Sequence, residues 1–512
     1  MSTKKILAVL LALFVLATAV SGCGNSGSSS ADSQSGSSAT SENSASTEDT
    51  ASTDGEVPTI SLMVVCGTTP PDADAVAEKL SEITREKIGC NVEFITMEIG
   101  NVAQQLNLLL SGGDDTLDVF MAGISVPYST IVNNGQALSL DTLMEPYAEE
   151  VKTALGEKVY ESGRVNGELY GIGRLLDQAS TTCYNLRRDI AEEFGYKNGD
   201  KVDLAELTEL FGKVREKYPD TPLIGPMNGV PSIGDSRIDS LGNKLGVLDN
   251  YGQDTTVTNY YESAGYEELV GYFKQWKEMG CYMADILNVT DAPIDYIPSG
   301  KAFGCFASHF SAEMNGIWSS QNFGTDIASL QIYEDAVAIT PGAYECINPA
   351  TKNPEAAAAL IYLMATDPDV ENLLINGIEG QHYQVLEDNT ATYVDGKDIS
   401  TTGWCLGYSW TALNSTISIP FEYPADYYDR MLAANKNAQQ SKAFGCQFDL
   451  TGVSGAVSAC TNVVNQYENA LSGGAVEDFD ATLAQFQQGL RDAGIDEIVA
   501  AKQEQLDAFL AG

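Results

Sequence analysis

The first 22 residues constrain where the rest of the chain can fold. Lys4 and Lys5 precede an apolar run from Ile6 to Val20 that contains no charged residue. The run is about 15 residues long, fewer than the roughly 20 that a membrane-spanning helix needs, and polar sequence follows it. This pattern is typical of a secretory signal peptide, which is removed from the mature protein. The sequence therefore predicts a signal peptide over residues 1–22.

Small residues stand directly before Cys23. The stretch Val20-Ser21-Gly22-Cys23 resembles the bacterial lipobox, in which the signal is cut just before a cysteine that then carries lipid. Lipidation of Cys23 would anchor the chain to the bilayer, on the extracytoplasmic face of the cell membrane. An ordinary secretory cleavage site with an incidental cysteine is the alternative interpretation.

Residues 24–56 separate this cysteine from the rest of the chain. They are almost all Ser, Gly, Ala, Thr, Asp and Glu, with no aromatic residue and no apolar cluster. Such a composition cannot bury enough apolar surface to fold, so a disordered linker is predicted. A flexible coil of this length reaches on the order of 30 Å. We therefore expect residues 23–57 to form a lipid-bearing tether that precedes the folded part.

The remainder of the chain is too long for one ordinary hydrophobic core. The chain has 512 residues, of which 44 % are hydrophobic and 9 % aromatic, as in globular proteins. We therefore expect two lobes. The formal net charge of −43 repels nucleic acid and anionic lipid head groups alike, so a nucleic-acid partner is not expected.

The cysteines and histidines do not form a metal-binding pattern. The ten cysteines include no CxxC pair, and those after Cys23 stand mostly in apolar runs, as Cys66 and Cys305 do. We expect buried thiols, with one or two disulfide bridges as the alternative. Because His309 and His382 are the only histidines, no metal and no cofactor is expected. The sequence contains no P-loop, HExxH or GxSxG motif, so no catalytic residue is predicted.

The folded part begins with strands that alternate with helices. Residues 59–66, 91–97 and 117–121 are predicted as strands, and residues 72–88 and 101–110 as the helices between them. Strands that alternate with helices form a parallel sheet with right-handed crossovers. The predicted fold class is therefore α/β.

The carboxyl ends of these strands are the first place to expect a ligand. Ligands of open α/β sheets bind beyond those ends, where Thr68 follows the first strand and Tyr128 lies just after the third. Asp118 stands at the start of the third strand, where it could accept ligand hydroxyls or satisfy backbone groups at the edge of the strand. Thr68, Asp118 and Tyr128 are therefore candidate ligand-binding residues.

Several segments together resemble family 1 extracellular solute-binding proteins of ABC importers. Asn107–Phe120 is similar to the family's "SGD" helix end and "Asp-Val-Phe" strand, and Val165–Ile172 to its "dGk-Y-gip" segment. Ser299–Phe306 resembles the family's "sGkaA" strand. Beyond this strand, where relatives often present ligand contacts, stand His309 and Trp318. An ordinary loop histidine is the alternative for His309.

The resemblance is closest in the carboxy-terminal part. Gly377–Tyr383 resembles the "GiEG-HY" signature of LipO-type lipoproteins, a subgroup of these solute-binding proteins. Trp404–Gly407 and Ser441–Phe448 resemble further marks of that subgroup. Tyr408 departs from the pattern, because the subgroup has Asn at this position. If that Asn contacts the ligand in relatives, the resemblance implies a different ligand class for this chain. Residues 457–509 are predicted to form three amphipathic helices.

The resemblance implies a two-lobed periplasmic-binding-protein (Venus-flytrap) α/β fold, type II-like, with a helical carboxy-terminal segment. Two lobes joined by crossing strands suggest a hinge that closes on a small molecule. The predicted parts are 58–178 for the first lobe, 179–334 for the second, 335–378 for a return to the first, and 379–512 for the second-lobe return with the carboxy-terminal helical domain.

The family further implies a binding protein that delivers its ligand to permease subunits and a separate ATPase. Aromatic rings stack on sugars, so a carbohydrate, in particular an oligosaccharide, is the expected ligand of a monomeric protein. The aromatic candidates, each of which could instead belong to a lobe core, are Tyr128, Trp318, Tyr383, Trp404, Tyr408 and Trp410. A peptide or cationic solute, or a surface glycan-active enzyme or sensor, are the alternatives; the enzyme would need two carboxylates facing each other across a cleft.

Overall fold

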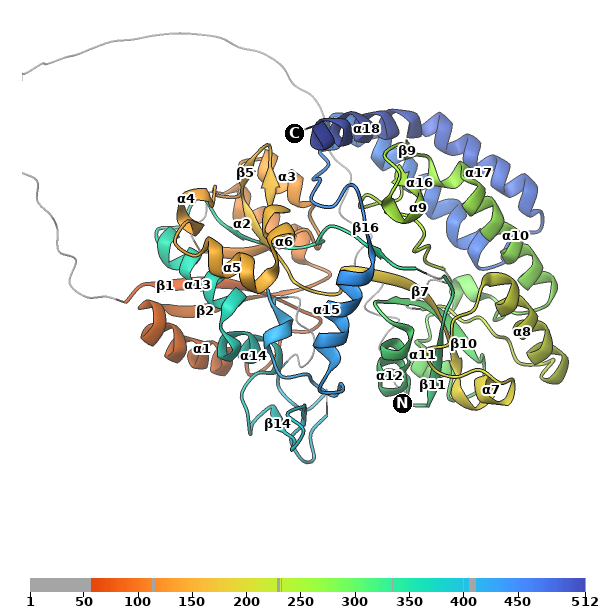
Figure 1. Ribbon diagram of the computed structural model, residues 1–512, viewed down its shortest axis with the longest axis horizontal. Helices are drawn as coiled ribbons and strands as arrows, with labels where there is room; N and C mark the ends of the chain where they lie inside the picture. The colour runs from red at the N-terminus through yellow and green to blue at the C-terminus, as the bar shows by residue number, and fades with distance from the viewer. Residues whose placement is uncertain are drawn as a thin grey trace, which may run out of the picture. The chain divides into compact units, whose positions relative to one another are not determined.

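The computed structural model of the chain describes residues 57–112, 116–227, 231, 233–333, 335–398, 400–404 and 411–511. The candidate residues Cys23, Tyr408 and Trp410 lie outside these ranges. Within them, two lobes each surround a β-sheet of their own (Figure 1).

The apolar run Thr59–Cys66 forms the predicted strand and lies inside a five-stranded sheet. Its side chains alternate between two hydrophobic clusters, with Ile60 and Leu62 in one and Met63 and Val65 in the other. The strand order is β2-β1-β3-β13-β6, with β13 antiparallel to its neighbours and the pairs of β1 parallel. The strands are β1 (Thr59–Cys66), β2 (Asn91–Glu98), β3 (Val119–Ala122), β6 (Gly171–Gly173) and β13 (Tyr344–Ile347).

Helices and two short hairpins complete this first lobe, whose buried side chains come from residues 60–175 and 344–421. Helix α1 ends at Gly89, as predicted, in a left-handed conformation with φ of 70°. The helices are α1 (Ala73–Ile88), α2 (Val102–Ser111), α3 (Tyr128–Asn133), α4 (Asp141–Met144), α5 (Ala148–Leu155), α6 (Glu157–Glu161), α13 (Pro354–Thr366) and α14 (Pro368–Asn376). The hairpins are β4 (Arg164–Val165) with β5 (Glu168–Leu169), and β14 (Tyr383–Val385) with β15 (Ala391–Tyr393).

The second lobe is built on β7 (Ala179–Arg187), which pairs antiparallel with β10 (Gly304–His309) and β11 (Ile327–Gln331). Trp276 is fully buried in the core of this lobe, and its Nε1 donates to Thr208 Oγ1 at 2.9 Å. The remaining elements are α7 (Arg188–Glu193), α8 (Leu204–Lys217), β8 (Val247–Leu248), α9 (Asp249–Gly252), β9 (Val257–Thr258), α10 (Ala264–Glu278), α11 (Pro293–Tyr296) and α12 (Ala312–Phe323).

The three predicted carboxy-terminal helices pack on this second lobe. They are α16 (Ser454–Ser472), α17 (Phe479–Ala493) and α18 (Ile495–Ala511). Cys460, Phe486 and Ile498 join the core of the lobe as expected. Phe509, which the apolar pattern assigns to the buried stripe of the last helix, is instead 42 % exposed.

Three chain segments cross between the lobes. β12 (Val337–Ala338) pairs antiparallel with the start of β7 and parallel with β16 (Gln439–Gln440). Helix α15 (Tyr427–Asn437) precedes β16 in the centre of Figure 1. Its Asn435 Oδ1 accepts the backbone N–H groups of Gln178 and Ala179 at 3.0 and 2.9 Å, which ties the helix to the first crossing.

The described residues between 383 and 421 pack with the first lobe. Tyr383, Ala391, Trp404 and Phe421 share its hydrophobic cluster with side chains of β1. This packing differs from the predicted return to the second lobe at residue 379. The chain returns to the second lobe after α15, where Ala443 and Cys446 join a cluster with Leu241 and Leu248.

The eight cysteines of the described ranges are all buried and free. They are Cys66, Cys90, Cys183, Cys281, Cys305, Cys346, Cys446 and Cys460. The expectation of small buried thiols is confirmed for these eight.

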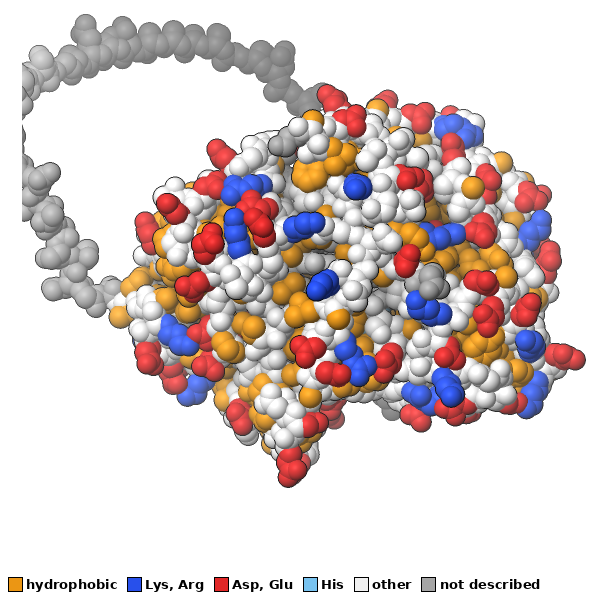
Figure 2. All heavy atoms as spheres, in the orientation of Figure 1, with side chains coloured by type: hydrophobic (Ala, Val, Ile, Leu, Met, Phe, Trp, Pro, Cys, Tyr) orange, Lys and Arg blue, Asp and Glu red, His pale blue; other side chains and the backbone are white. Residues whose placement is uncertain are grey.

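The surface carries the negative charge of the composition on both lobes. On the face shown in Figure 2, Asp and Glu side chains are spread over the body and interspersed with Lys and Arg. Of the helices that the structure describes, none combines the length and the apolar character needed to span a bilayer.

Three ionisable side chains are buried together in the first lobe. Arg174 is 5 % exposed and donates from Nε to the Ala412 carbonyl at 2.6 Å, while Glu345 and Glu371 are fully buried. Both oxygens of Glu345 lack a hydrogen-bond partner within the described part of the chain. Burial raises the pKa of Glu345 and of Glu371 to about 8, although the nearby Arg174 opposes this shift.

Replacing Glu345 with Gln is expected to stabilise the protein at pH 8. Because the folded-state pKa of Glu345 lies above its unfolded value, the unfolded chain releases the proton first. Stability is therefore lost as pH rises from about 4.5 to 8. The amide keeps the neutral shape and does not ionise, so the melting-temperature advantage of Glu345→Gln should grow between pH 5 and pH 8. The exposed Glu216→Gln control should show no such trend, and an advantage of equal size at both pH values would contradict the assignment.

Candidate functional site

One cavity between the lobes lies beside Tyr128, and we call it the Tyr128 cavity. Its volume is about 430 Å³. The first lobe lines it with residues 127–129, and the second lobe with residues 239–243, which we call the second-lobe wall. The crossing segment that follows β16 completes it with residues 446–448, which we call the crossing wall. The cavity thus touches both lobes and lies near the carboxyl end of β3, the position that the sequence predicts for a ligand.

A second cavity of about 300 Å³ adjoins the first and is called the Asp177 cavity. It is lined by Ile124 after β3, by Arg174 and residues 176–178 before β7, and by residues 339–343. Ile339 to Gly342 line both cavities, so this stretch of the second crossing separates them.

Two glycines allow the end of β3 and the segment after β12 to approach each other closely beside the cavities. A Cβ atom at Gly123 would lie 2.0 Å from the Gly342 carbonyl oxygen, and Gly123 has φ of 103°. Only glycine fits a backbone approach this close in that conformation. The end of β3 is therefore packed directly against the second crossing.

Asp177 is the chemically most distinctive group of its cavity. The side chain is solvent-exposed, yet desolvation by the surrounding walls raises its pKa to about 6. The neighbouring Gln178 has a buried Nε2 without a hydrogen-bond partner in the described part of the chain. At neutral pH this pair offers a carboxylate acceptor and an amide donor, a combination that suits a ligand rich in hydroxyl groups.

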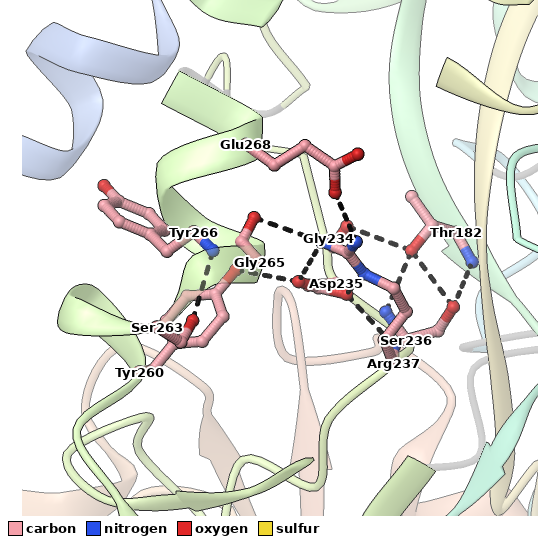
Figure 3. A network of polar contacts seen from close by, with 10 residues as sticks. All are labelled: Thr182, Gly234, Asp235, Ser236, Arg237, Tyr260, Ser263, Gly265, Tyr266 and Glu268. Carbon is pink, nitrogen blue, oxygen red and sulfur yellow. Dashed lines mark hydrogen bonds and ion pairs between the residues drawn. The ribbon is translucent and has the colours of Figure 1, made fainter. Parts of the chain in front are cut away.

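A polar network fixes the segment that leads into the second-lobe wall (Figure 3). Thr182 Oγ1 on β7 donates to the Gly234 carbonyl at 3.0 Å. Arg237 donates from Nε and Nη2 to the two oxygens of Asp235, both at 2.9 Å, and from Nη1 to Glu268 at 2.8 Å. The fork-like pairing of Arg237 with Asp235 gives the segment a defined geometry.

Tyr128 lies at the cavity that bears its name but is almost fully buried. Its ring stacks on Tyr344, with centroids 4.2 Å apart, and its hydroxyl donates to the Gly163 carbonyl at 2.5 Å. Burial raises the pKa of Tyr128 well above its ordinary value. The pair of rings forms an aromatic floor of the cavity.

The other candidates of the first lobe lie elsewhere. Thr68 is exposed just after β1 and lines neither cavity. Tyr383 accepts from Asn372 Nδ2 at 2.5 Å, and Trp404 Nε1 donates to the Leu374 carbonyl at 3.3 Å. Both of these rings belong to the hydrophobic core, which is the alternative that the sequence leaves open for them.

Asp118 binds the protein's own groups. Its Oδ2 accepts the backbone N–H and the hydroxyl of Ser61 at 2.8 and 2.9 Å, and Oδ1 accepts the hydroxyl of Thr351. The side chain is 5 % exposed. This arrangement matches the structural role that the sequence analysis gives as one of two possibilities.

His309 and Trp318 lie in the second lobe and line neither cavity. His309 ends β10, is half-buried and accepts the Ser311 backbone N–H at Nδ1 at 3.4 Å. Burial lowers its pKa to about 4, so the ring is neutral at pH 7. Trp318 packs edge-on against Phe323 at 5.9 Å between centroids.

Sequence reasoning missed the residues that line the cavities from the crossing and from the second lobe. Asp177 and Gln178 directly precede the predicted crossing strand at 179, and this position is a signal that could have identified them. The second-lobe wall carries no comparable sequence signal. No group of three or more His, Cys, Asp or Glu side chains suited to a metal ion occurs among the described residues.

Comparisons with known proteins agree on the fold. A family model described as "Domain of unknown function (DUF3502)" matches residues 442–511. The chain is 23 % identical over 474 residues to a carbohydrate ABC transporter substrate-binding protein of Streptococcus pneumoniae serotype 4, covering 90 % of this chain and 92 % of that protein.

Among solved structures, the chain resembles the N-glycan transport solute binding protein NgtS of Streptococcus pneumoniae. The TM-score is 0.76 at 20 % identity, covering 89 % of this chain and 99 % of that one; NgtS is also known in complex with Man5GlcNAc. It further resembles the substrate-binding protein FusA of S. pneumoniae in complex with kestose, with a TM-score of 0.57 at 14 % identity over 88 % and 99 % of the two chains. The predicted α/β solute-binding fold with a helical carboxy-terminal segment is thus confirmed.

Replacing Asp118 with Ala is expected to lower the free energy of unfolding by about 2–3 kcal/mol, because buried donors lose a charged acceptor. Urea denaturation followed by circular dichroism measures this loss. The exposed Asp220→Ala control should stay within about 0.5 kcal/mol of the wild type. A wild-type stability for Asp118→Ala would contradict the structural role.

Proposed function

We propose that the chain captures an oligosaccharide between its two lobes and delivers it to an ABC importer. By its fold and its sequence relatives it is an extracellular solute-binding protein of the carbohydrate ABC transporter type, as its sequence segments predict. The observation that carries the proposal is the pair of adjoining cavities, whose walls come from both lobes and from the crossing segments.

The mechanism is binding coupled to hinge motion. In the closed arrangement a ligand contacts both residues 127–129 and the second-lobe wall. It stabilises this arrangement by the difference between its binding free energies to the closed and open forms, and by no more. The crossings at β7, β12 and β16 are where the lobes can turn relative to each other. Closure then signals the loaded state to the transporter.

The chemistry of the cavities suits sugars. The stacked rings of Tyr128 and Tyr344 give the Tyr128 cavity a rigid floor, and the cavity is lined by both polar and apolar residues, as a sugar with its hydroxyl groups and C–H faces requires. In the adjoining cavity, Asp177 supplies a carboxylate acceptor for hydroxyl groups. The presence of two neighbouring cavities, of about 430 and 300 Å³, favours an oligosaccharide over a single sugar.

The remaining parts of the proposal concern the cell surface. The apolar run before Cys23 supports export, and the lipobox-like residues support a lipid anchor at Cys23 on the extracytoplasmic face. The polar segment up to residue 56 would tether a monomeric binding protein within reach of two permease subunits, and a separate ATPase would supply the energy for transport. The resemblance of Gly377–Tyr383 to LipO-type lipoproteins supports placement in that subgroup.

A thermal-shift screen of the protein without residues 1–23 tests the function. Man5GlcNAc or kestose is expected to raise the melting temperature, because a ligand at a hundredfold excess over its Kd adds about 2.7 kcal/mol to the native state. Monosaccharides and a peptide mixture serve as comparisons. A shift with peptides alone would replace carbohydrate by peptide as the ligand, and a glycan recovered in cleaved form would overturn the non-enzymatic function.

Replacing Asp177 with Asn is expected to weaken binding of the glycan that gives the largest shift about tenfold, or about 1.4 kcal/mol, because a charged acceptor is lost. Since the pKa of Asp177 is about 6, wild-type binding should also weaken from pH 7.5 to pH 5 as the carboxylate is protonated. Calorimetric titration measures both effects. Asp220→Asn is the matched control, and a Kd of Asp177→Asn equal to that of the wild type would remove this residue from the site.

A further inference from the structure

Lys502 fills the interior of a loop that carries the second-lobe wall. The base of the loop is closed by Asp239 and Leu248, which exchange two backbone hydrogen bonds of 2.9 and 3.0 Å. Lys502 comes from α18 and is fully buried. Its Nζ lies within hydrogen-bond distance of Leu241 O at 3.0 Å, Asn243 Oδ1 at 2.8 Å and Gly246 O at 3.0 Å.

The three acceptors match the three N–H donors of the ammonium form of Lys502. An ammonium has three N–H donors, and each of the three acceptors takes one of them. Without the side chain of Lys502, the buried carbonyl groups of Leu241 and Gly246 would lose this donor. Buried carbonyls without partners are rare in folded proteins, so the loop conformation depends on the lysine.

The backbone of the loop cannot hold its shape by local preference alone. Leu241 and Lys244 have φ of 45° and 59°, in the left-handed region that non-glycine residues seldom occupy. Gly242 and Gly246 also have positive φ. Such conformations persist where surrounding contacts enforce them, and the ammonium supplies three of those contacts.

The same helix also holds the segment that follows the crossing wall. Gln505 donates from Nε2 to the Asp449 carbonyl at 2.9 Å, and its Oε1 accepts the Asp449 backbone N–H at 2.7 Å. Phe448, the neighbour of Asp449, lines the Tyr128 cavity and accepts the Ser129 hydroxyl through its carbonyl at 2.8 Å. Through the side-chain amide of Gln505, helix α18 thus holds the end of the crossing wall, which is itself hydrogen-bonded to the first lobe.

Apolar contacts connect the two walls beneath the cavity. Leu241 of the second-lobe wall, Cys446 of the crossing wall and Leu506 of α18 belong to one small hydrophobic cluster, and Phe448 packs against it. Lys502 Nζ also lies 5.8 Å from the ring centroid of Phe448. Both walls therefore rest on the same face of α18.

We infer that α18 positions two walls of the Tyr128 cavity, with Lys502 and Gln505 as the positioning residues. This gives the segment 442–511, which matches the family model of a domain of unknown function, a role in shaping the ligand site. That the shaped site receives a carbohydrate rests on the proposed function, whereas the anchoring of the walls is a property of the protein without ligand.

The test combines hydrogen exchange of the ligand-free protein with ligand titration. In Lys502→Met, which keeps the apolar stem, amide exchange of residues 240–248 should become at least tenfold faster, while residues 59–66 of β1 stay unchanged. The Kd for Man5GlcNAc, or for kestose if wild type binds it more tightly, should rise at least tenfold. Leu207→Ala, in the core on α8, is the matched control. It should lower the melting temperature without changing loop exchange or affinity.

Gln505→Ala tests the crossing wall with a milder change at a half-buried position. It should accelerate exchange of residues 446–450 and weaken binding, and it decides the matter if Lys502→Met does not fold. Unchanged exchange in both walls, or faster exchange with unaltered affinity, would overturn the inference. If wild type bound neither glycan, the proposed function would fail, while the exchange rates would still support or overturn the anchoring.

Discussion

The pairing of β12 with β7 on one side and β16 on the other is the constraint on which the rest of the molecule depends. β12 has only two residues, Val337 and Ala338, yet they join all three crossings into one small sheet. Both cavities lie against the residues that follow it, Ile339 to Gly342. The small sheet of β7, β12 and β16 is therefore the place about which the two lobes can turn. A ligand beside this sheet contacts the crossing segments and the lobes at the same time.

Local sequence patterns predict the elements of this fold well. The bounds of β1 agree with the predicted strand, because a short apolar run without helical period has few other structures available. The start of α13 at Pro354 follows from the proline itself. The pattern fails at Phe509, where the last turns of a terminal helix extend beyond the surface on which they could pack.

The sequence predicts where the candidate site lies, but it identifies few of the residues that line it. The carboxyl end of β3 borders both cavities as topology demands, whereas the ring of Trp404 serves the core, since an aromatic residue has the same sequence signature in a core and in a cleft. Lys502 shows most clearly why the residues that shape the site cannot be predicted from the sequence. Its three acceptors stand 256 to 261 residues away along the chain, so only the folded structure reveals that a lysine on an ordinary amphipathic helix organises a distant loop.

The eight buried thiols have a consequence for the life of the protein outside the cytoplasm. Burial raises the pKa of every one of them, which suppresses the thiolate through which cysteine reacts with oxidants and disulfides. In the folded protein these eight thiols therefore react slowly with oxidants and disulfides in the surroundings. The described parts of the hinge and the cavities therefore do not depend on a disulfide bond among these eight cysteines.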